Sequence, residues 1–334
     1  MKKILSTLLI ATAVLGLTAC GGSGSNSSKT STKTFKLAHN LTEDHPVHKA
    51  MAKFGENLEK ESNGELKVQI FPNGVLGGER EAMEQLQSGA LDMTKVSAGT
   101  LENFEPSYQV LSLPYIFDSE AKFREVMAGP VSEKLYKTTE GKGFQGITYY
   151  TSGARSFYTK NKPILTPDDL KGMKIRVMDN KTAIRMVELM GGAPTPLPYG
   201  EIYTALQQGV IDGAESNETA LTIGKHGEVA KAFSRDEHTV IPDILVISER
   251  TLNGLTPEQK ELVKKAAKES TEYQLQLWDE EIKNAIKEAQ DRQKVTFYEV
   301  DKKPFQEKTA VLIEEAKQNP ALKELVIDIQ EAQK

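Results

Sequence analysis

Two arginines lie on predicted strands in the middle of the chain, where their guanidinium groups could bind an acid. Arg176 alternates with two apolar residues, and neighbouring strand residues face opposite sides of a sheet, so it is expected to face away from the core or into a cleft. A guanidinium fork binds a carboxylate through two parallel hydrogen bonds. Arg155, on the preceding strand, is expected to lie beside it, and adjacent guanidinium groups repel each other unless they share an anion. The residues alone leave an alternative open, in which each arginine pairs with a local acid such as Asp179 or Glu188.

Motifs for other chemistry are absent or incomplete. Residues 141–146 fit the dinucleotide fingerprint G-x-G-x-x-G, but a helical pattern precedes them and a strand follows, the reverse of the required order. The chain has no P-loop and no nucleophile elbow, and no carboxylate or cysteine motif completes a metal site with His45 and His48. A Ser-His-Asp triad is spatial and leaves no fixed spacing, and nothing in the chain points to one. We therefore expect no catalytic residue, no metal and no cofactor.

The segments that must position the arginines alternate between strand and helix patterns. A β-α-β-α-β order after residue 35 indicates a parallel α/β sheet, and a second α/β unit begins close to residue 153. About 300 folded residues are enough for two domains with sizeable cores. The predicted strands span 35–38, 66–71, 91–96, 145–150, 155–159, 173–178 and 244–247, and the predicted helices start at Pro46 or span 79–87, 182–190 and 201–208.

The segment after Thr256 predicts long helical structure. Thr256, Pro257 and Gln259 combine an N-cap, a first-turn proline and a capping-box glutamine. No proline or glycine follows until Pro304, and apolar residues keep a rough helical period. A helix of about 35 residues would be about 50 Å long, which exceeds the width of one small domain. The pattern fits one helix that crosses both domains, and it also fits two helices with an unmarked break.

The N-terminal residues 1–19 are predicted to be a signal peptide. Lys2 and Lys3 precede a short apolar run with a small-residue cleavage site, and the run is shorter than the about 20 residues that a membrane-spanning helix needs. Cys20 is the only cysteine, so no intramolecular disulfide can form. Residues 20–34 are predicted to be a tether, because 21–34 are rich in Gly and Ser and contain no hydrophobic residue.

The cleavage site and the charge indicate where the protein works. Leu-Thr-Ala-Cys at 17–20 is similar to the bacterial lipobox, in which the cysteine becomes the new N-terminus and carries acyl chains. This similarity implies lipidation at Cys20 and an anchor at the membrane. The net charge is −5 at pH 7, and no basic run suggests nucleic acid as a partner. We therefore expect a secreted protein that is lipid-anchored to the outer face of the cell membrane.

Residues 152–217 carry the most specific motifs. They contain Leu-Lys-Gly-Met-Lys-Ile-Arg-Val at 170–177, Gly-Ala-Pro-Thr-Pro at 192–196, Ala-Leu-Gln-Gln-Gly at 205–209 and Ile-Asp-Gly-Ala-Glu at 211–215. Together with Gly-Val-Leu-Gly-Gly-Glu-Arg at 74–80, these motifs resemble the solute-binding subunits of TRAP (tripartite ATP-independent periplasmic) transporters of the DctP type. The resemblance extends from Phe35 to about Lys303.

The resemblance implies a two-domain, periplasmic-binding-protein-like α/β fold that closes on its ligand like a Venus flytrap. A long C-terminal helix would span both domains. The expected division is 35–152 plus about 242–281 for domain I, and 153–241 plus about 282–334 for domain II.

The same resemblance implies roles for individual residues. Arg176 matches the arginine that pairs with the ligand carboxylate, and Arg155 matches a supporting arginine. Where the family often has asparagine after Asp-Gly-Ala-Glu, this chain has Ser216 followed by Asn217, so either a water fills the gap or Asn217 substitutes. Other family positions that line the cleft or contact the ligand are matched by Tyr199, Asn40, Glu79 and Ser97. Apart from the resemblance, Lys95 is expected to share the face of Ser97, and His39 and Lys95 could provide partners for ligand hydroxyls.

The ligand is expected to be an organic acid, and the membrane subunits of a TRAP permease are the expected protein partner. Short runs such as Arg-Ser-Phe-Tyr at 155–158 and His-Gly-Glu-Val at 226–229 resemble the subgroup that binds hexuronates. C4-dicarboxylates are the alternative ligands. Their second carboxylate would require a second cation, which Lys95 could supply. An exported hydrolase and a surface adhesin are the competing classes of function.

Overall fold

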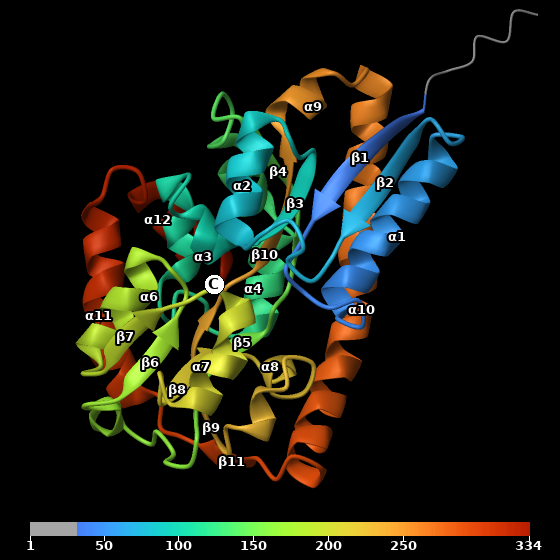
Figure 1. The fold of residues 1–334 in the computed structure, drawn as a ribbon. Helices are drawn as coiled ribbons and strands as arrows, with labels where there is room; N and C mark the ends of the chain where they lie inside the picture. Colours follow the sequence, from blue (N-terminus) through green and yellow to red (C-terminus); the bar gives the residue numbers. More distant parts are fainter. Residues whose placement is uncertain (1–31) are drawn as a thin grey trace, which may run out of the picture. The chain divides into compact units, whose positions relative to one another are not determined.

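Two mixed β-sheets form the core of the part of the chain that the computed structural model describes, residues 32–334 (Figure 1). The predictions on the signal peptide, on Cys20 and on most of the tether concern residues 1–31, which lie outside the described residues. From Thr32 to Lys334 the chain forms one unit by its internal contacts.

The first sheet has the strand order β2-β1-β3-β10-β4. As predicted, β1 runs parallel to β2 and β3, whereas β10 arrives from much later in the sequence and runs antiparallel to β3 and β4. Every residue of β3 and β10 is buried, which is typical of central strands covered on both faces. The elements are β1 (Lys33–Ala38), α1 (Pro46–Glu61), β2 (Leu66–Phe71), α2 (Glu79–Ser88), β3 (Met93–Ser97), β4 (Phe144–Tyr150) and β10 (Asp243–Ser248).

The second sheet has the strand order β11-β9-β5-β8-β6-β7. Its strand β8 lies between β5 and β6, antiparallel to the first and parallel to the second. The elements are β5 (Ala154–Thr159), β6 (Lys174–Val177), α6 (Lys181–Leu189), β7 (Ala193–Pro196), α7 (Ile202–Gln208), β8 (Gly213–Ser216), α8 (Thr219–Thr222), β9 (Ala232–Val240) and β11 (Thr296–Glu299).

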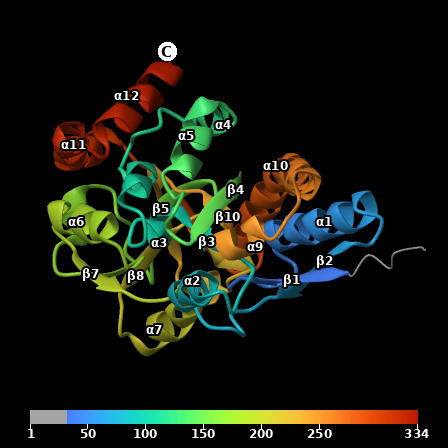
Figure 2. The ribbon, with the colours of Figure 1, turned by 90° about the horizontal axis from the view of Figure 1, so that it is seen from above.

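Shorter helices cover the sheets and connect their strands. The residues of the G-x-G-x-x-G match follow a helix and lead into β4, so the structure has the inverted order that excluded a dinucleotide site. Near the C-terminus, α11 packs against α6 of the second sheet, and α12 packs against α4 and α5 beside the first sheet (Figure 2). These helices are α3 (Ala98–Leu101), α4 (Glu120–Met127), α5 (Pro130–Lys137), α9 (Glu249–Asn253), α11 (Lys303–Gln318) and α12 (Lys323–Ala332).

A single long helix, α10 (Pro257–Asp291), connects the two sheets, so the alternative of two shorter helices is wrong. Its capping box is formed by Thr256 and Gln259, as the sequence predicted. The helix packs against α1 and β4 of the first sheet and against α8 beside the second (Figures 1 and 2). No helix within residues 32–334 is long and apolar enough to cross a membrane.

The middle of α10 contacts the segment that connects β4 to β5. The Gln274 amide accepts a hydrogen bond from the Thr151 backbone N–H (3.1 Å) and donates one to the Thr151 carbonyl (2.9 Å). One turn further on, the buried indole of Trp278 packs on Gly153, which has a φ of +63°. A Cβ atom at Gly153 would lie 3.3 Å from this indole, so both the backbone conformation and the close approach favour glycine.

Candidate functional site

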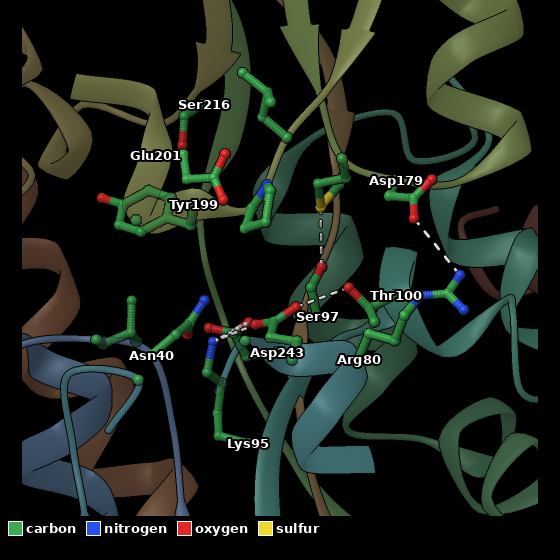
Figure 3. Close-up of a pocket in the computed structure, with 18 of the residues that line it drawn as sticks. Asn40, Arg80, Lys95, Ser97, Thr100, Asp179, Tyr199, Glu201, Ser216 and Asp243 are labelled. Carbon is green, nitrogen blue, oxygen red and sulfur yellow. Dashed lines mark hydrogen bonds and ion pairs between the residues drawn. The ribbon is translucent and has the colours of Figure 1, made fainter. Parts of the chain in front are cut away.

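A cavity of about 810 Å³ is lined by residues from both sheets. Figure 3 shows Asn40 and Lys95 on one side of this cavity and Tyr199 and Ser216 on the other. Nine of the ten predicted ligand-binding residues line it, namely Asn40, Glu79, Lys95, Ser97, Arg155, Tyr199, Arg176, Ser216 and Asn217. The structure therefore brings together side chains that lie up to 177 positions apart in the sequence.

Arg155 projects from β5 and is neutralised by a glutamate of the neighbouring strand β8. Its Nε lies 2.5 Å from Glu215 Oε2, and its Nη2 donates to Glu215 Oε1 (2.9 Å) and to the Glu215 carbonyl (2.8 Å). Both side chains are buried, and burial alone would oppose both charges. The mutual attraction outweighs burial, because the pKa of Glu215 is lowered to about 2 and that of Arg155 is raised. Arg155 therefore pairs with an acid of the protein, but this acid is Glu215, 60 positions away, and neither Asp179 nor Glu188.

Arg155 and Arg176 do not lie on adjacent strands of the sheet, although their charges are close enough to interact. Strand β8 separates β5 from β6, because the chain returns from α7 to insert β8 between them. Glu215, which belongs to the Ile-Asp-Gly-Ala-Glu motif, projects from this inserted strand and takes up the charge of Arg155. The repulsion expected between the arginines is thereby relieved on one of them by a protein carboxylate.

Arg176 on β6 has much less compensation. It is 4% exposed, and its Nε donates to the Leu197 carbonyl at 2.8 Å. No ion pair among residues 32–334 includes it. Burial, together with the nearby Arg155 charge, lowers its pKa despite the attraction of Glu215. A buried cation that lines a cavity with one hydrogen bond is an incomplete site for an anion.

Ser216 and Asn217 follow Glu215 at the edge of the cavity. The Asn217 Oδ1 accepts hydrogen bonds from the backbone N–H (2.9 Å) and the hydroxyl (2.6 Å) of Thr219. The side-chain oxygen of Asn217 therefore stabilises the turn before α8. The side-chain amide nitrogen remains available to another partner. Both Ser216 and Asn217 are buried and line the cavity, so the geometry is compatible with either of them near the carboxylate.

The opposite wall of the cavity is built around the buried ammonium group of Lys95 on β3. Its Nζ lies 2.8 Å from Glu79 Oε1 and 3.2 Å from Asp243 Oδ1 (Figure 3). Burial disfavours the ammonium ion, but Asp243 and Glu79 together raise the pKa of Lys95. Asp243 was not among the predicted residues. It directly precedes the predicted strand at 244–247, and that position at a strand end was the available signal.

His39 does not line the cavity. Its ring is buried, its Nδ1 accepts from the Leu41 backbone N–H at 3.1 Å, and its Nε2 lies 3.0 Å from His48 Nδ1. Both ring nitrogens are therefore occupied by the protein, and burial lowers the pKa of His39 to about 2, so the ring is neutral. His45 lines the cavity instead. Its Nδ1 accepts from the Val47 backbone N–H at the start of α1, and burial lowers its pKa to about 3.

Two further lining residues, Asn40 and Ser97, differ in whether their side-chain oxygen has a partner in the described chain. The Asn40 Oδ1 is buried and has no hydrogen-bond partner within the described chain. The Ser97 hydroxyl lies 3.4 Å from Met178 Sδ and accepts from the Gly99 backbone N–H. Within residues 32–334, no cluster of three or more His, Cys, Asp or Glu side chains could hold a metal ion.

Comparison with known proteins relates this geometry to a family. The family described as "Bacterial extracellular solute-binding protein, family 7" (DctP) matches residues 37–319. The protein YiiZ of Salmonella typhimurium is 47% identical over 288 residues, which cover 86% of this chain and 88% of YiiZ.

Solved structures extend the similarity to the fold. A TRAP periplasmic solute-binding protein of Anaerococcus prevotii, with bound α/β-D-glucuronate, has a TM-score of 0.88 at 35% identity and covers 90% of this chain and 98% of its own. A Sulfitobacter TRAP protein with bound β-D-galacturonate has a TM-score of 0.86 at 40% identity, with 90% and 100% covered. The predicted two-domain, periplasmic-binding-protein-like fold is thereby confirmed. The chain belongs to the DctP family of extracytoplasmic solute-binding proteins of TRAP transporters.

Proposed function

We propose that this protein captures a hexuronate, such as glucuronate or galacturonate, and delivers it to the membrane permease of a TRAP transporter. The proposal rests on the uncompensated charge of Arg176. Of the four cationic side chains that line the cavity, Arg80, Lys95 and Arg155 each have a carboxylate partner, and Arg176 has none within the described chain. A ligand carboxylate would supply the missing negative charge through a bidentate pair.

A hexuronate suits the rest of the cavity. The unpartnered Asn40 Oδ1 can accept a hydrogen bond from a sugar hydroxyl, and the Ser216 hydroxyl and the Asn217 amide can donate to ligand oxygens. The bound glucuronate and galacturonate of the two similar TRAP proteins support the same choice. Arg155 would contribute positive potential and hold Glu215 in place, while Arg176 would make the direct pair.

Capture requires the two domains to close. In this proposal domain I comprises 35–152 with about 242–281, and domain II comprises 153–241 with about 282–334; α12 is an appendage of domain II that docks on α4 and α5. A ligand that contacts Arg176 of one domain and Asn40 of the other binds the closed state better than the open state, and this difference drives closure.

Calorimetric titration of the chain without residues 1–20 tests this function. Co-purified ligand is first removed by unfolding and refolding. We expect one molecule of glucuronate or galacturonate to bind per chain, and a hundredfold excess over Kd to stabilise the fold by about 2.7 kcal/mol. Binding of succinate without binding of either hexuronate would show that the ligand is a C4-dicarboxylate. Silence with every acid in a panel that includes aldonates and 2-oxoacids would contradict the transport role, and turnover of an acid would indicate an enzyme.

The membrane location is the second part of the proposal. Cleavage before Cys20 and acylation of its thiol would anchor the protein outside the membrane, and two or more acyl chains give stable attachment. The residues after Cys20 would let the folded part reach the permease. We expect mass spectrometry to find an acylated N-terminal Cys20, and Cys20→Ser to release the protein from the membrane fraction. An intact residue 1–20 segment in the mature protein would contradict the anchor.

A further inference from the structure

The wall built around Lys95 holds two carboxylates and one ammonium group. Three side chains meet there from three different elements: the partly buried Glu79 from α2 and the buried Lys95 from β3 and Asp243 from β10. Lys95 is 2% exposed, and its ammonium group lies within 3.2 Å of both carboxylates. One cation therefore serves two anions.

Hydroxyl donors complete this cluster. Thr100 Oγ1 donates to Glu79 Oε2 at 2.8 Å (Figure 3). Ser152 Oγ donates to Asp243 Oδ2 at 3.2 Å. Every oxygen of the two carboxylates thus has a donor from the protein. Neither carboxylate therefore requires a cation or a hydrogen-bond donor from a ligand. The charge of Lys95 is compensated within the cluster and is not available to a ligand carboxylate.

The consequence for a ligand depends on its second functional group. A hydroxyl placed against this wall can exchange hydrogen bonds with carboxylate oxygens at little cost. A carboxylate in the same place meets two like charges at short range, in a site shielded from water, and a like charge in such a place is strongly disfavoured. The cavity is lined by two further acids, Glu81 and Glu201. Apart from Arg176, its lining offers no cation without a carboxylate partner, because Arg80 pairs with Asp179.

We propose that Asp243, together with Glu79, is a specificity-determining residue that excludes a second carboxylate from the ligand. The site thereby takes hydroxylated monocarboxylates and rejects aldarates, the dicarboxylates in which both ends of a sugar are oxidised. This inference rests on the proposed function, because it concerns the far end of the ligand whose carboxylate pairs with Arg176. It also removes Lys95 as the second cation that a C4-dicarboxylate would need.

The directions of the pKa shifts distinguish the two acids, and Glu79 is the more firmly charged of them. The pKa of Glu79 is lowered, because the attraction and hydrogen bonds of Lys95 outweigh the effect of burial. Burial raises the pKa of Asp243. Glu79 neutralises Lys95 whether Asp243 is ionised or protonated. Lys95 is therefore not a free cation in either state.

Competition between D-glucuronate and D-glucarate measures the exclusion. The two molecules differ in the oxidation of one terminal carbon. We expect the wild-type chain without residues 1–20 to bind glucarate at least about tenfold more weakly than glucuronate, which equals about 1.4 kcal/mol. Asp243→Asn should lower this ratio about tenfold, and Glu79→Gln should lower it in the same direction. Glucarate is open-chain, but this difference in shape is the same in every variant, so a change in the ratio reports the charge of the wall.

Glu84→Gln is the matched control. Glu84 lies exposed on α2, the helix that carries Glu79, and its substitution removes the same charge from the whole protein without touching the cavity. We expect its ratio to equal that of the wild type. Equal binding of both acids by the wild type would overturn the inference, as would an unchanged ratio in both Asp243→Asn and Glu79→Gln. Failure of glucuronate to bind at all would instead overturn the proposed function.

Discussion

Arg176→Ala is expected to weaken hexuronate binding by at least about thirtyfold, since truncating one partner of a buried charge pair costs about 2–5 kcal/mol. The free protein is expected to keep its stability to within about 1 kcal/mol. In the free state the guanidinium is buried with a single hydrogen bond, to the Leu197 carbonyl, so its removal relieves an unfavourable charge. Calorimetric titration gives the affinity, and urea denaturation without ligand gives the stability.

Two arginine variants make this result specific. Arg176→Lys retains the charge without the planar fork, so we expect an affinity between those of the wild type and the alanine variant. Arg185→Ala removes an exposed arginine on α6 that pairs with Glu315 at the surface, and we expect no change in affinity. An affinity for Arg176→Ala within a factor of two of the wild type would rule out the arginine clamp.

Glu215→Gln is expected to lower the free energy of unfolding by about 3 kcal/mol, because it leaves the buried guanidinium of Arg155 without its counter-charge. Glutamine keeps the shape of the side chain and one acceptor oxygen, so the loss reports charge rather than packing. His238 Nε2 lies 3.4 Å from Glu215 Oε2, and Glu215 and Asp236 raise the pKa of His238 to about 9. Removing the Glu215 charge therefore also removes part of the compensation of a second buried cation. Urea denaturation measures the change.

Glu315→Gln is the control for this substitution. It removes the carboxylate of another arginine–glutamate pair, in which both side chains are about half exposed to solvent. Exposed pairs contribute about 0–1 kcal/mol, so we expect little change in stability. A loss in Glu215→Gln no larger than the loss in Glu315→Gln would show that the buried pair does not stabilise the fold.

Local signals in the sequence account for most of the secondary structure. The capping box at Thr256 and the absence of proline and glycine before Pro304 predicted the start of α10 and helical structure after it, because a helix begins at a cap and continues until a residue breaks it. They left open whether this structure is one helix or two. The alternation of strand and helix patterns predicted the parallel pairing of β1 with β2 and β3. The insertion of β8 between β5 and β6 could not be predicted in this way, because strand order depends on how the chain returns to the sheet and not on a local pattern.

The sequence by itself determined the two α/β units, the helical character of the segment after Thr256 and the candidate arginines, since these depend on periodicity, caps and short motifs. The tertiary structure decided which arginine has a free charge, because Glu215 reaches Arg155 from an inserted strand and leaves Arg176 without a carboxylate partner in the described chain. It also decided that Lys95 is neutralised, by Glu79 together with an aspartate 148 positions away, and that His39 does not line the cavity. Charge compensation in a buried site depends on distances of a few ångströms between residues that are remote in sequence, and only the folded chain fixes those distances.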